Sequence, residues 1–102
     1  MVKKVPKFSN KQNLNKSNIA GVPDNTAAVY EFLDGKGNNI YTGIAGRVRV
    51  QQRLMEHLSG GEDKIPGAKQ FRVAQVGNKV EAKKIEDQII KKEQPKFNIQ
   101  GK

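Results

Sequence analysis

The sequence contains no cysteine and only one histidine. Without cysteine there are no disulfides or thiolate metal sites, and one histidine cannot assemble a zinc cluster. No apolar run approaches the roughly 20 residues that a transmembrane helix needs, and no signal-peptide core is visible at the N-terminus. We therefore expect a soluble protein that acts in the cytoplasm and has no membrane partner.

Acidic residues are also scarce. The 102 residues include 10 Asp and Glu against 19 Lys and Arg, a formal net charge of +9. A basic surface attracts polyanions over long distances, so the charge favours a nucleic-acid partner, with a merely solubilising lysine surface as the alternative. The length predicts one small domain with a modest core.

The basic charge is not spread evenly along the chain. Residues 1–22 contain five lysines and no acidic residue. This composition predicts a flexible N-terminal arm, or one that is ordered only by docking. We place the folded domain at residues 23–102.

Two apolar segments separated by "DGKGNN" predict a β-hairpin. Residues 27–34 and 39–45 are rich in β-branched and aromatic side chains, and the intervening stretch offers several residues that adopt positive φ. Alternation places Tyr30 and Tyr41 on defined strand faces. Gly43 and Gly46 allow a close backbone approach or a bend where the second strand ends.

Helical spacing follows directly after this bend. Three apolar residues recur at i, i+4 and i+8 and predict a helix: Val50, Leu54 and Leu58. The same spacing brings three basic residues to the flank of this stripe: Arg49, Arg53 and His57.

The last third of the chain predicts a strand at residues 70–76 and a second helix within the segment 78–95. Asn78 is a suitable N-cap, and Pro95 lies beyond the end of this helix. The expected fold is therefore α+β: a small three-stranded, mainly antiparallel sheet flanked by helices.

Glu86 does not suit its position on the second helix. At 100° per residue it falls inside the apolar arc, between Ala82 and Ile90. A carboxylate there must reach water at the edge of the stripe, pair with an arginine, or bind a hard cation such as Mg²⁺. Because the other acidic residues are scattered, a site with one metal ion is easier to build than a site with two.

Together these features resemble the GIY-YIG nuclease domain family over about residues 23–98. The two signature motifs correspond to "AVY" (28–30) and "YTG" (41–43). The family's helical arginine and histidine correspond to "RLMEHL" (53–58), and its late helix corresponds to "EDQIIKKEQPKFN" (86–98).

The match departs from the family pattern in three places. Ala28 replaces a glycine, Thr42 replaces an isoleucine, and the segment "AGRVRVQQ" is about two residues longer than is usual in the family. The extra length leaves Arg47 and Arg49 as alternatives to Arg53, although the helical wheel favours Arg53.

The resemblance implies hydrolysis of phosphodiester bonds in DNA with one Mg²⁺ or Mn²⁺ ion. Glu86 would hold the ion, Arg53 would stabilise charge on the phosphoryl oxygens, and Tyr30 or Tyr41 would activate or position water. His57 would relay a proton or contact phosphate, with an ordinary surface role as the alternative.

The remaining candidates support the site or bind substrate. Gly43 and Asn98 are expected to fix the site geometry, and Arg47, Arg49 and Lys91 are expected to bind nucleic acid, with RNA as an alternative to DNA. Two other functional classes are open: a non-catalytic nucleic-acid-binding module, and the C-terminal DNase module of a larger secreted interbacterial toxin. A toxin module would have an immunity protein as its partner.

Overall fold

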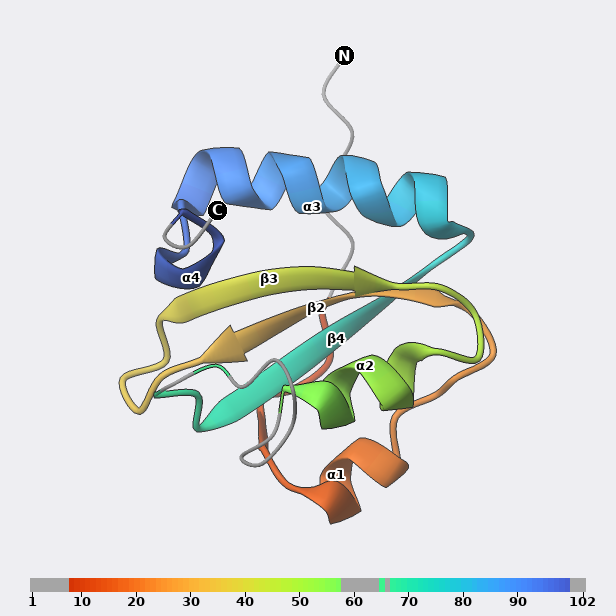
Figure 1. Ribbon diagram of the computed structural model, residues 1–102, viewed down its shortest axis with the longest axis horizontal. Coiled ribbons are helices and arrows are strands. Elements are labelled where there is room, and N and C mark those ends of the chain that lie inside the picture. Colours follow the sequence, from red (N-terminus) through yellow and green to blue (C-terminus); the bar gives the residue numbers. More distant parts are fainter. Residues whose placement is uncertain (1–7, 58–64, 66, 100–102) are drawn as a thin grey trace.

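Four strands form one antiparallel sheet in the spatial order β1-β4-β2-β3 (Figure 1). The computed structural model describes residues 8–57, 65 and 67–99. The strands are β1 (Gln12–Asn13), β2 (Ala27–Leu33), β3 (Asn39–Ala45) and β4 (Gln70–Val76). Strands β2 and β3 form the predicted hairpin, and β3 is an edge strand of the sheet.

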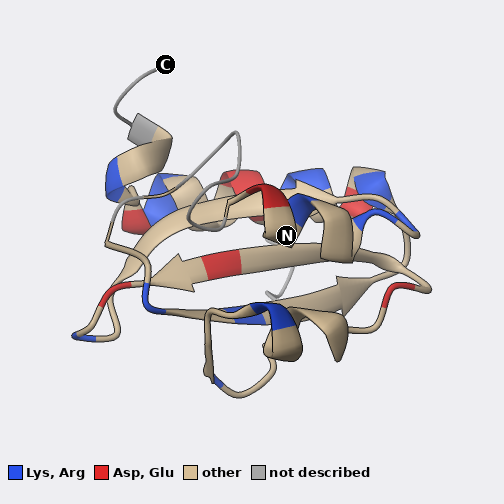
Figure 2. Ribbon diagram, turned by 60° about the horizontal axis from the view of Figure 1, so that its bottom comes forward, with Lys and Arg blue, Asp and Glu red and all other residues tan. Residues whose placement is uncertain are grey.

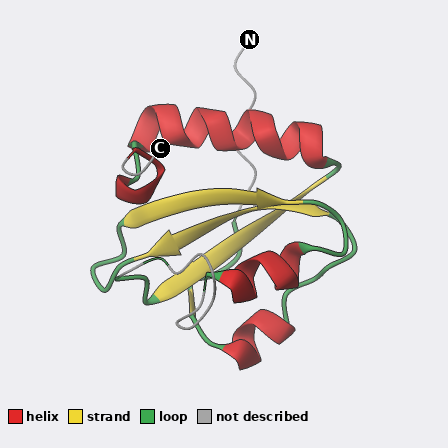
Figure 3. Ribbon diagram, in the orientation of Figure 1, coloured by secondary structure: helices red, strands yellow, loops and turns green. Residues whose placement is uncertain are grey.

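Helices cover the sheet on both faces (Figure 3). They are α1 (Lys16–Ala20), α2 (Val50–Glu56), α3 (Lys79–Glu93) and α4 (Lys96–Ile99). The long helix α3 packs mainly on β3 and β2, α4 lies against β3, and α1 packs on α2. Within the described residues, no helix is both long and apolar enough to span a membrane.

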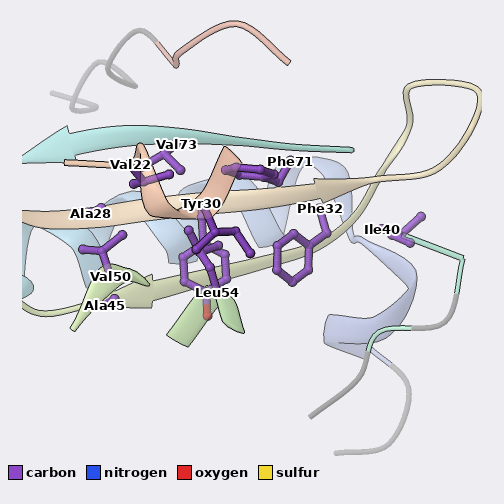
Figure 4. Packing of buried hydrophobic residues seen from close by; sticks show 11 residues of the cluster. Val22, Ala28, Tyr30, Phe32, Ile40, Ala45, Val50, Leu54, Phe71 and Val73 are labelled. Atoms are coloured by element: carbon purple, nitrogen blue, oxygen red, sulfur yellow. The ribbon is translucent and has the colours of Figure 1, made fainter. Parts of the chain in front are cut away.

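Strand alternation divides the core into two clusters. On one face, β2 contributes a set of buried residues that pack with α2 (Figure 4): Ala28, Tyr30 and Phe32. On the other face, Val29 packs against the apolar stripe of α3: Ala82, Ile85 and Ile89. Because neighbouring residues of β2 point to opposite faces, the buried strand is apolar on both sides, with one exception, Glu31.

The predicted α+β architecture is confirmed, and the sheet has one strand more than expected. The additional strand β1 pairs Gln12 with Phe71 and Asn13 with Gln70 on β4. Its two residues are too few to leave an alternation pattern in the sequence. Leu58, expected in the stripe of the first helix, lies outside the described residues.

Residues 8–22 differ from the expected flexible arm. Ile19 on α1 is fully buried and Val22 is nearly so, both in the cluster that contains Tyr30. These two apolar side chains provide the burial that fixes the segment. The domain boundary at residue 23 and the flexibility of residues 1–7, which lie outside the described part, stay predictions.

The N-terminus of helix α2 is capped by the side chain of Asp24, which lies 26 residues before Val50 in the sequence. The Oδ1 atom of Asp24 accepts hydrogen bonds from the backbone N–H of Val50 at 2.8 Å and of Gln51 at 3.3 Å. A carboxylate at this end satisfies unpaired donors and complements the helix dipole. For α3 the predicted N-cap is confirmed, since the side chain of Asn78 accepts from the N–H of Glu81.

Candidate active site

A cluster of rings lies between β2, β3 and α2. Tyr30 is fully buried, and its hydroxyl lies 3.0 Å from Nε2 of His57. The ring centroid of Tyr41 lies 6.4 Å from that of Tyr30 and 5.2 Å from that of His57. His57 is itself buried, so the surface role considered for it is wrong.

Gly43 makes room for Tyr30. The two residues are directly opposite each other in the β2–β3 pair. A Cβ atom at position 43 would lie 2.5 Å from both Cζ and the hydroxyl oxygen of Tyr30. Only glycine therefore lets the phenol ring lie across β3, which is the close approach expected from the sequence.

Arg53 is the arginine beside this cluster. Its side chain is half-buried and forms an ion pair with Glu56, three residues later on the same helix. Partial burial lowers the pKa of Arg53, but interactions with Tyr30, Glu56 and Tyr41 outweigh it and raise that pKa overall. Arg47 and Arg49, the alternatives left open by the sequence, are exposed in the loop before α2.

The pKa of the Tyr30 hydroxyl depends on its burial and on the charged and polar groups that surround it. Burial raises this pKa well above the usual tyrosine value of 10.0, and the proximity of Tyr41 and Glu86 raises it further. Arg53 opposes the shift through its charge and a hydrogen bond. Tyr41, Arg53 and Glu86 thus lie close enough to act on the hydroxyl of Tyr30, although the four residues come from four different elements.

Glu86 lies on α3 with its side chain 13 % exposed. Its Oε1 atom is 3.1 Å from Nζ of Lys83, which also contacts the carboxylate of Asp87 at 3.2 Å. An arginine was one of the expected partners of Glu86, whereas the cation in this ion pair is a lysine. The i, i+3 spacing on a helix is the signal that could have identified Lys83.

The donor set around Glu86 suits a hard ion with few protein ligands. No group of three or more His, Cys, Asp or Glu residues that could hold a metal ion occurs among residues 8–57, 65 and 67–99. Mg²⁺ binds through one or two carboxylates and keeps several waters. One carboxylate at the edge of a hydrophobic face therefore fits Mg²⁺ or Mn²⁺ better than it fits zinc.

Asn98 binds the edge of the sheet next to the site. Its Oδ1 accepts from the backbone N–H of Thr42 at 2.7 Å, and its Nδ2 donates to the carbonyl of Thr42 at 2.9 Å. Thr42 separates Tyr41 from Gly43 on β3. Asn98 therefore takes the place of a neighbouring strand and fixes this part of β3.

The residues expected to bind nucleic acid lie on the surface. Lys91 is exposed on α3, and Arg47 and Arg49 are exposed beyond the end of β3. Basic positions recur along the whole of α3 (Figure 2). The binding role of these three residues stays a prediction.

Comparison with known proteins gives one family and one set of solved structures. The model of the UvrC-like GIY-YIG domain matches residues 26–99. The GIY-YIG N-terminal endonuclease domain of UvrC from Thermotoga maritima, bound to its catalytic divalent cation magnesium, is 32 % identical with a TM-score of 0.69. The match covers 82 % of this chain and 94 % of that chain.

Point mutants of the same Thermotoga maritima domain are also similar. An asparagine-to-alanine mutant bound to its catalytic divalent cation is 29 % identical, with a TM-score of 0.65 over 80 % of this chain and 91 % of that chain. A tyrosine-to-phenylalanine mutant, also bound to its cation, is 28 % identical, with a TM-score of 0.67 over 82 % and 94 %. No curated protein sequence matches this chain.

Proposed function

This chain belongs to the UvrC-like GIY-YIG domain family, and from that membership we propose that it is an endonuclease that hydrolyses phosphodiester bonds in DNA with one divalent metal ion. The observation that carries the proposal is that Arg53 and Glu86, from two different helices, both lie near enough to act on the buried hydroxyl of Tyr30, which bonds His57. These residues come from β2, α2 and α3, and a sheet packed only for stability has no need to bring them together.

Glu86 is the residue that would hold the metal ion. A bound Mg²⁺ or Mn²⁺ supplies Lewis-acid stabilisation of charge on the phosphate and the leaving oxygen. Lys83 occupies Oε1 of Glu86 and also contacts Asp87, so it can keep one carboxylate partner when Glu86 takes a metal ion. Magnesium in the Thermotoga maritima domain supports the choice of ion.

Tyr30 is the better candidate for moving the proton of the attacking water. Its raised pKa keeps the phenol neutral, so it works by relay and not as a preformed phenolate. The relay uses the His57 tautomer in which Nε2 carries no proton: water gives a proton to the hydroxyl oxygen of Tyr30 while that hydroxyl gives its own proton to Nε2, 3.0 Å away. Tyr41 is half-buried beside them and orients water or phosphate.

Arg53 supplies positive charge on the same side. Its guanidinium is held by Glu56 and interacts with Tyr30 and Tyr41. A planar guanidinium matches the oxygens of a phosphoryl group and stabilises the charge that develops on them in the transition state.

Cleavage of plasmid and linear duplex DNA by Glu86→Gln tests the proposal. We expect activity in Mg²⁺ that a chelator abolishes, and a loss of at least about a hundredfold in Glu86→Gln, since even residues that only support a ligand cost 10- to 100-fold. The control is Asp87→Asn, which removes the same charge one residue later, from the other carboxylate that contacts Lys83.

The same assay decides between this function and its alternatives. If Glu86→Gln cleaves DNA as fast as the unchanged protein, the activity comes from a contaminant and the proposal fails. Salt-sensitive DNA binding without cleavage in any divalent metal indicates a non-catalytic module. Growth arrest on expression inside bacteria, relieved by a co-expressed immunity protein, indicates a toxin module.

Comparing Tyr30→Phe with Tyr41→Phe in single turnovers tests the relay. We expect the larger loss of rate in Tyr30→Phe, because this change removes the hydroxyl that lies 3.0 Å from Nε2 of His57. A larger loss in Tyr41→Phe would assign the relay to Tyr41.

A further inference from the structure

Two large hydrophobic side chains are exposed in the described part of the chain, and both are valines with basic neighbours. Val48 is 68 % exposed and Val80 is 66 % exposed. Val48 lies between Arg47 and Arg49 in the loop from β3 to α2, and Val80 follows Lys79 at the start of α3. Figure 1 shows that this loop and the start of α3 lie at the same end of the sheet.

The backbone at Val48 is held in an unfavourable conformation. Its φ angle is +60°, a region that β-branched residues rarely adopt. The N–H of Val48 donates to the carbonyl of Asp24 at 2.8 Å, and the carboxylate of Asp24 caps α2 immediately afterwards. Strain of this kind persists where the surroundings enforce it, and it concentrates at functional sites.

The start of α3 forms one wall of a groove of about 500 Å³. Its lining consists of two apolar residues and three lysines: Ile44, Val80, Lys79, Lys83 and Lys84. Among the described residues no acidic side chain lines this groove, although Asp87 contacts Lys83 from the next turn. An apolar floor with a cationic rim is complementary to a sugar–phosphate backbone.

The loop, the groove and the candidate active site are continuous. A Cβ atom on Gly46 would lie 3.9 Å from Cδ of Lys79, so the first lysine of the groove lies over the start of the loop. At its other end the groove reaches the site through Lys83, whose Nζ contacts Glu86.

We propose that residues 46–49 and the first turns of α3 form a docking surface for duplex DNA. The basic side chains hold backbone phosphates, and Val48 and Val80 contact the apolar walls of the deoxyribose rings. RNA presents a 2′-hydroxyl at the corresponding position, so these valines favour DNA over RNA. The proposal rests on the proposed function and adds the residues that select the substrate.

Equilibrium binding of a fluorescent duplex in EDTA tests the lysines without any cleavage. The variant Lys79→Gln/Lys84→Gln leaves Lys83 and the site unchanged. Each phosphate contact contributes about 0.9 to the slope of log K against log salt, so we expect this slope to become about 1.8 shallower. The control is Lys16→Gln/Lys36→Gln, which removes two exposed lysines from α1 and the β2–β3 turn.

The valines are tested by Val48→Asn/Val80→Gln. Asparagine tolerates positive φ, and glutamine suits a helix, so the backbone is retained. We expect several-fold weaker binding of duplex DNA with an unchanged salt slope, and a smaller difference between DNA and RNA duplexes of the same sequence.

Several results overturn the docking surface. The first is a lysine variant that binds duplex DNA with the same salt slope as the control. The second is a valine variant that binds DNA as tightly as the unchanged protein. The third is an unchanged protein that binds RNA duplexes as tightly as DNA duplexes. Binding of a protein partner at the valines in place of DNA also overturns it. If the lysine variant cleaves DNA with an unchanged KM, the docking surface is rejected and the nuclease proposal stands. If DNA binding changes as expected in the variants but no protein cleaves DNA, the nuclease proposal is rejected and the docking surface stands.

Discussion

The space at Gly43 gives a direct test of how tightly the site is built. In Gly43→Ala the new methyl group would lie 2.5 Å from the hydroxyl oxygen and Cζ of Tyr30. Ordinary contact begins at 3.4 Å, so the ring must move by about 0.9 Å (3.4 − 2.5). The ring is fully buried between Phe32, Tyr41 and His57, and this movement must displace its neighbours or break the bond to His57.

Both stability and rate report this displacement. Overpacking of a tight core costs about 1–3 kcal/mol, which lowers the melting temperature of a domain this size by roughly 5–20 °C. A misplacement of about 1 Å at a reacting group costs about a hundredfold in rate. We therefore expect Gly43→Ala to fold at a reduced melting temperature and to lose most of its cleavage rate.

Calorimetry and single-turnover cleavage measure the two effects. The control is Gly77→Ala, since a Cβ atom at Gly77 meets nothing within 4 Å. If Gly43→Ala matches this control in melting temperature and rate, then the ring is free to move and the packing argument for Tyr30 is wrong.

Two further changes test the surroundings of the site. Asn98→Ala leaves the buried backbone of Thr42 on β3 without two hydrogen bonds, and we expect thermal denaturation to show a loss of about 1–3 kcal/mol; an unchanged melting temperature would refute this role. Burial raises the pKa of Glu31, and Arg72 opposes this shift only in part. The folded state therefore binds the proton more tightly, and the contribution of Glu31 to stability falls as pH rises above the ordinary value of 4.5. In urea denaturation, Glu31→Gln should lose less stability between about pH 4 and 7 than the unchanged chain, and parallel pH profiles would contradict this.

The elements of the fold could be predicted because each one leaves a local signal. Alternating apolar residues gave the strands of the hairpin, and the Asn78 cap marked the start of α3. Strand β1 leaves no such signal, because Gln12 and Asn13 form a strand only by pairing with the edge of β4. In the same way, Ile19 is buried by residues far from it in the sequence, such as Tyr30 and Leu54, so its neighbours in the sequence do not predict its burial.

The site could be predicted in its residue types but not in its contacts. Spacing on α2 placed Arg53 and His57 one turn apart. The bond between His57 and Tyr30 joins residues 27 positions apart, and only the packing of α2 on the sheet creates it. Lys83 is a residue that sequence reasoning missed, because an exposed lysine carries little information until its partner, Glu86, is seen to be nearly buried.

The cap on α2 shows that the candidate site depends on residues that precede the matched family domain. Family similarity starts at residue 26, after Asp24 and after the buried Ile19 and Val22. A chain shortened to the family boundary would leave the first N–H groups of α2 without their acceptor and would open the core beneath that helix. Because α2 carries Arg53 and ends at His57, the proposed activity should fall in such a chain even though every proposed reactive group is still present. Residues 8–25 therefore serve the candidate site mechanically, as the support that keeps α2 in place.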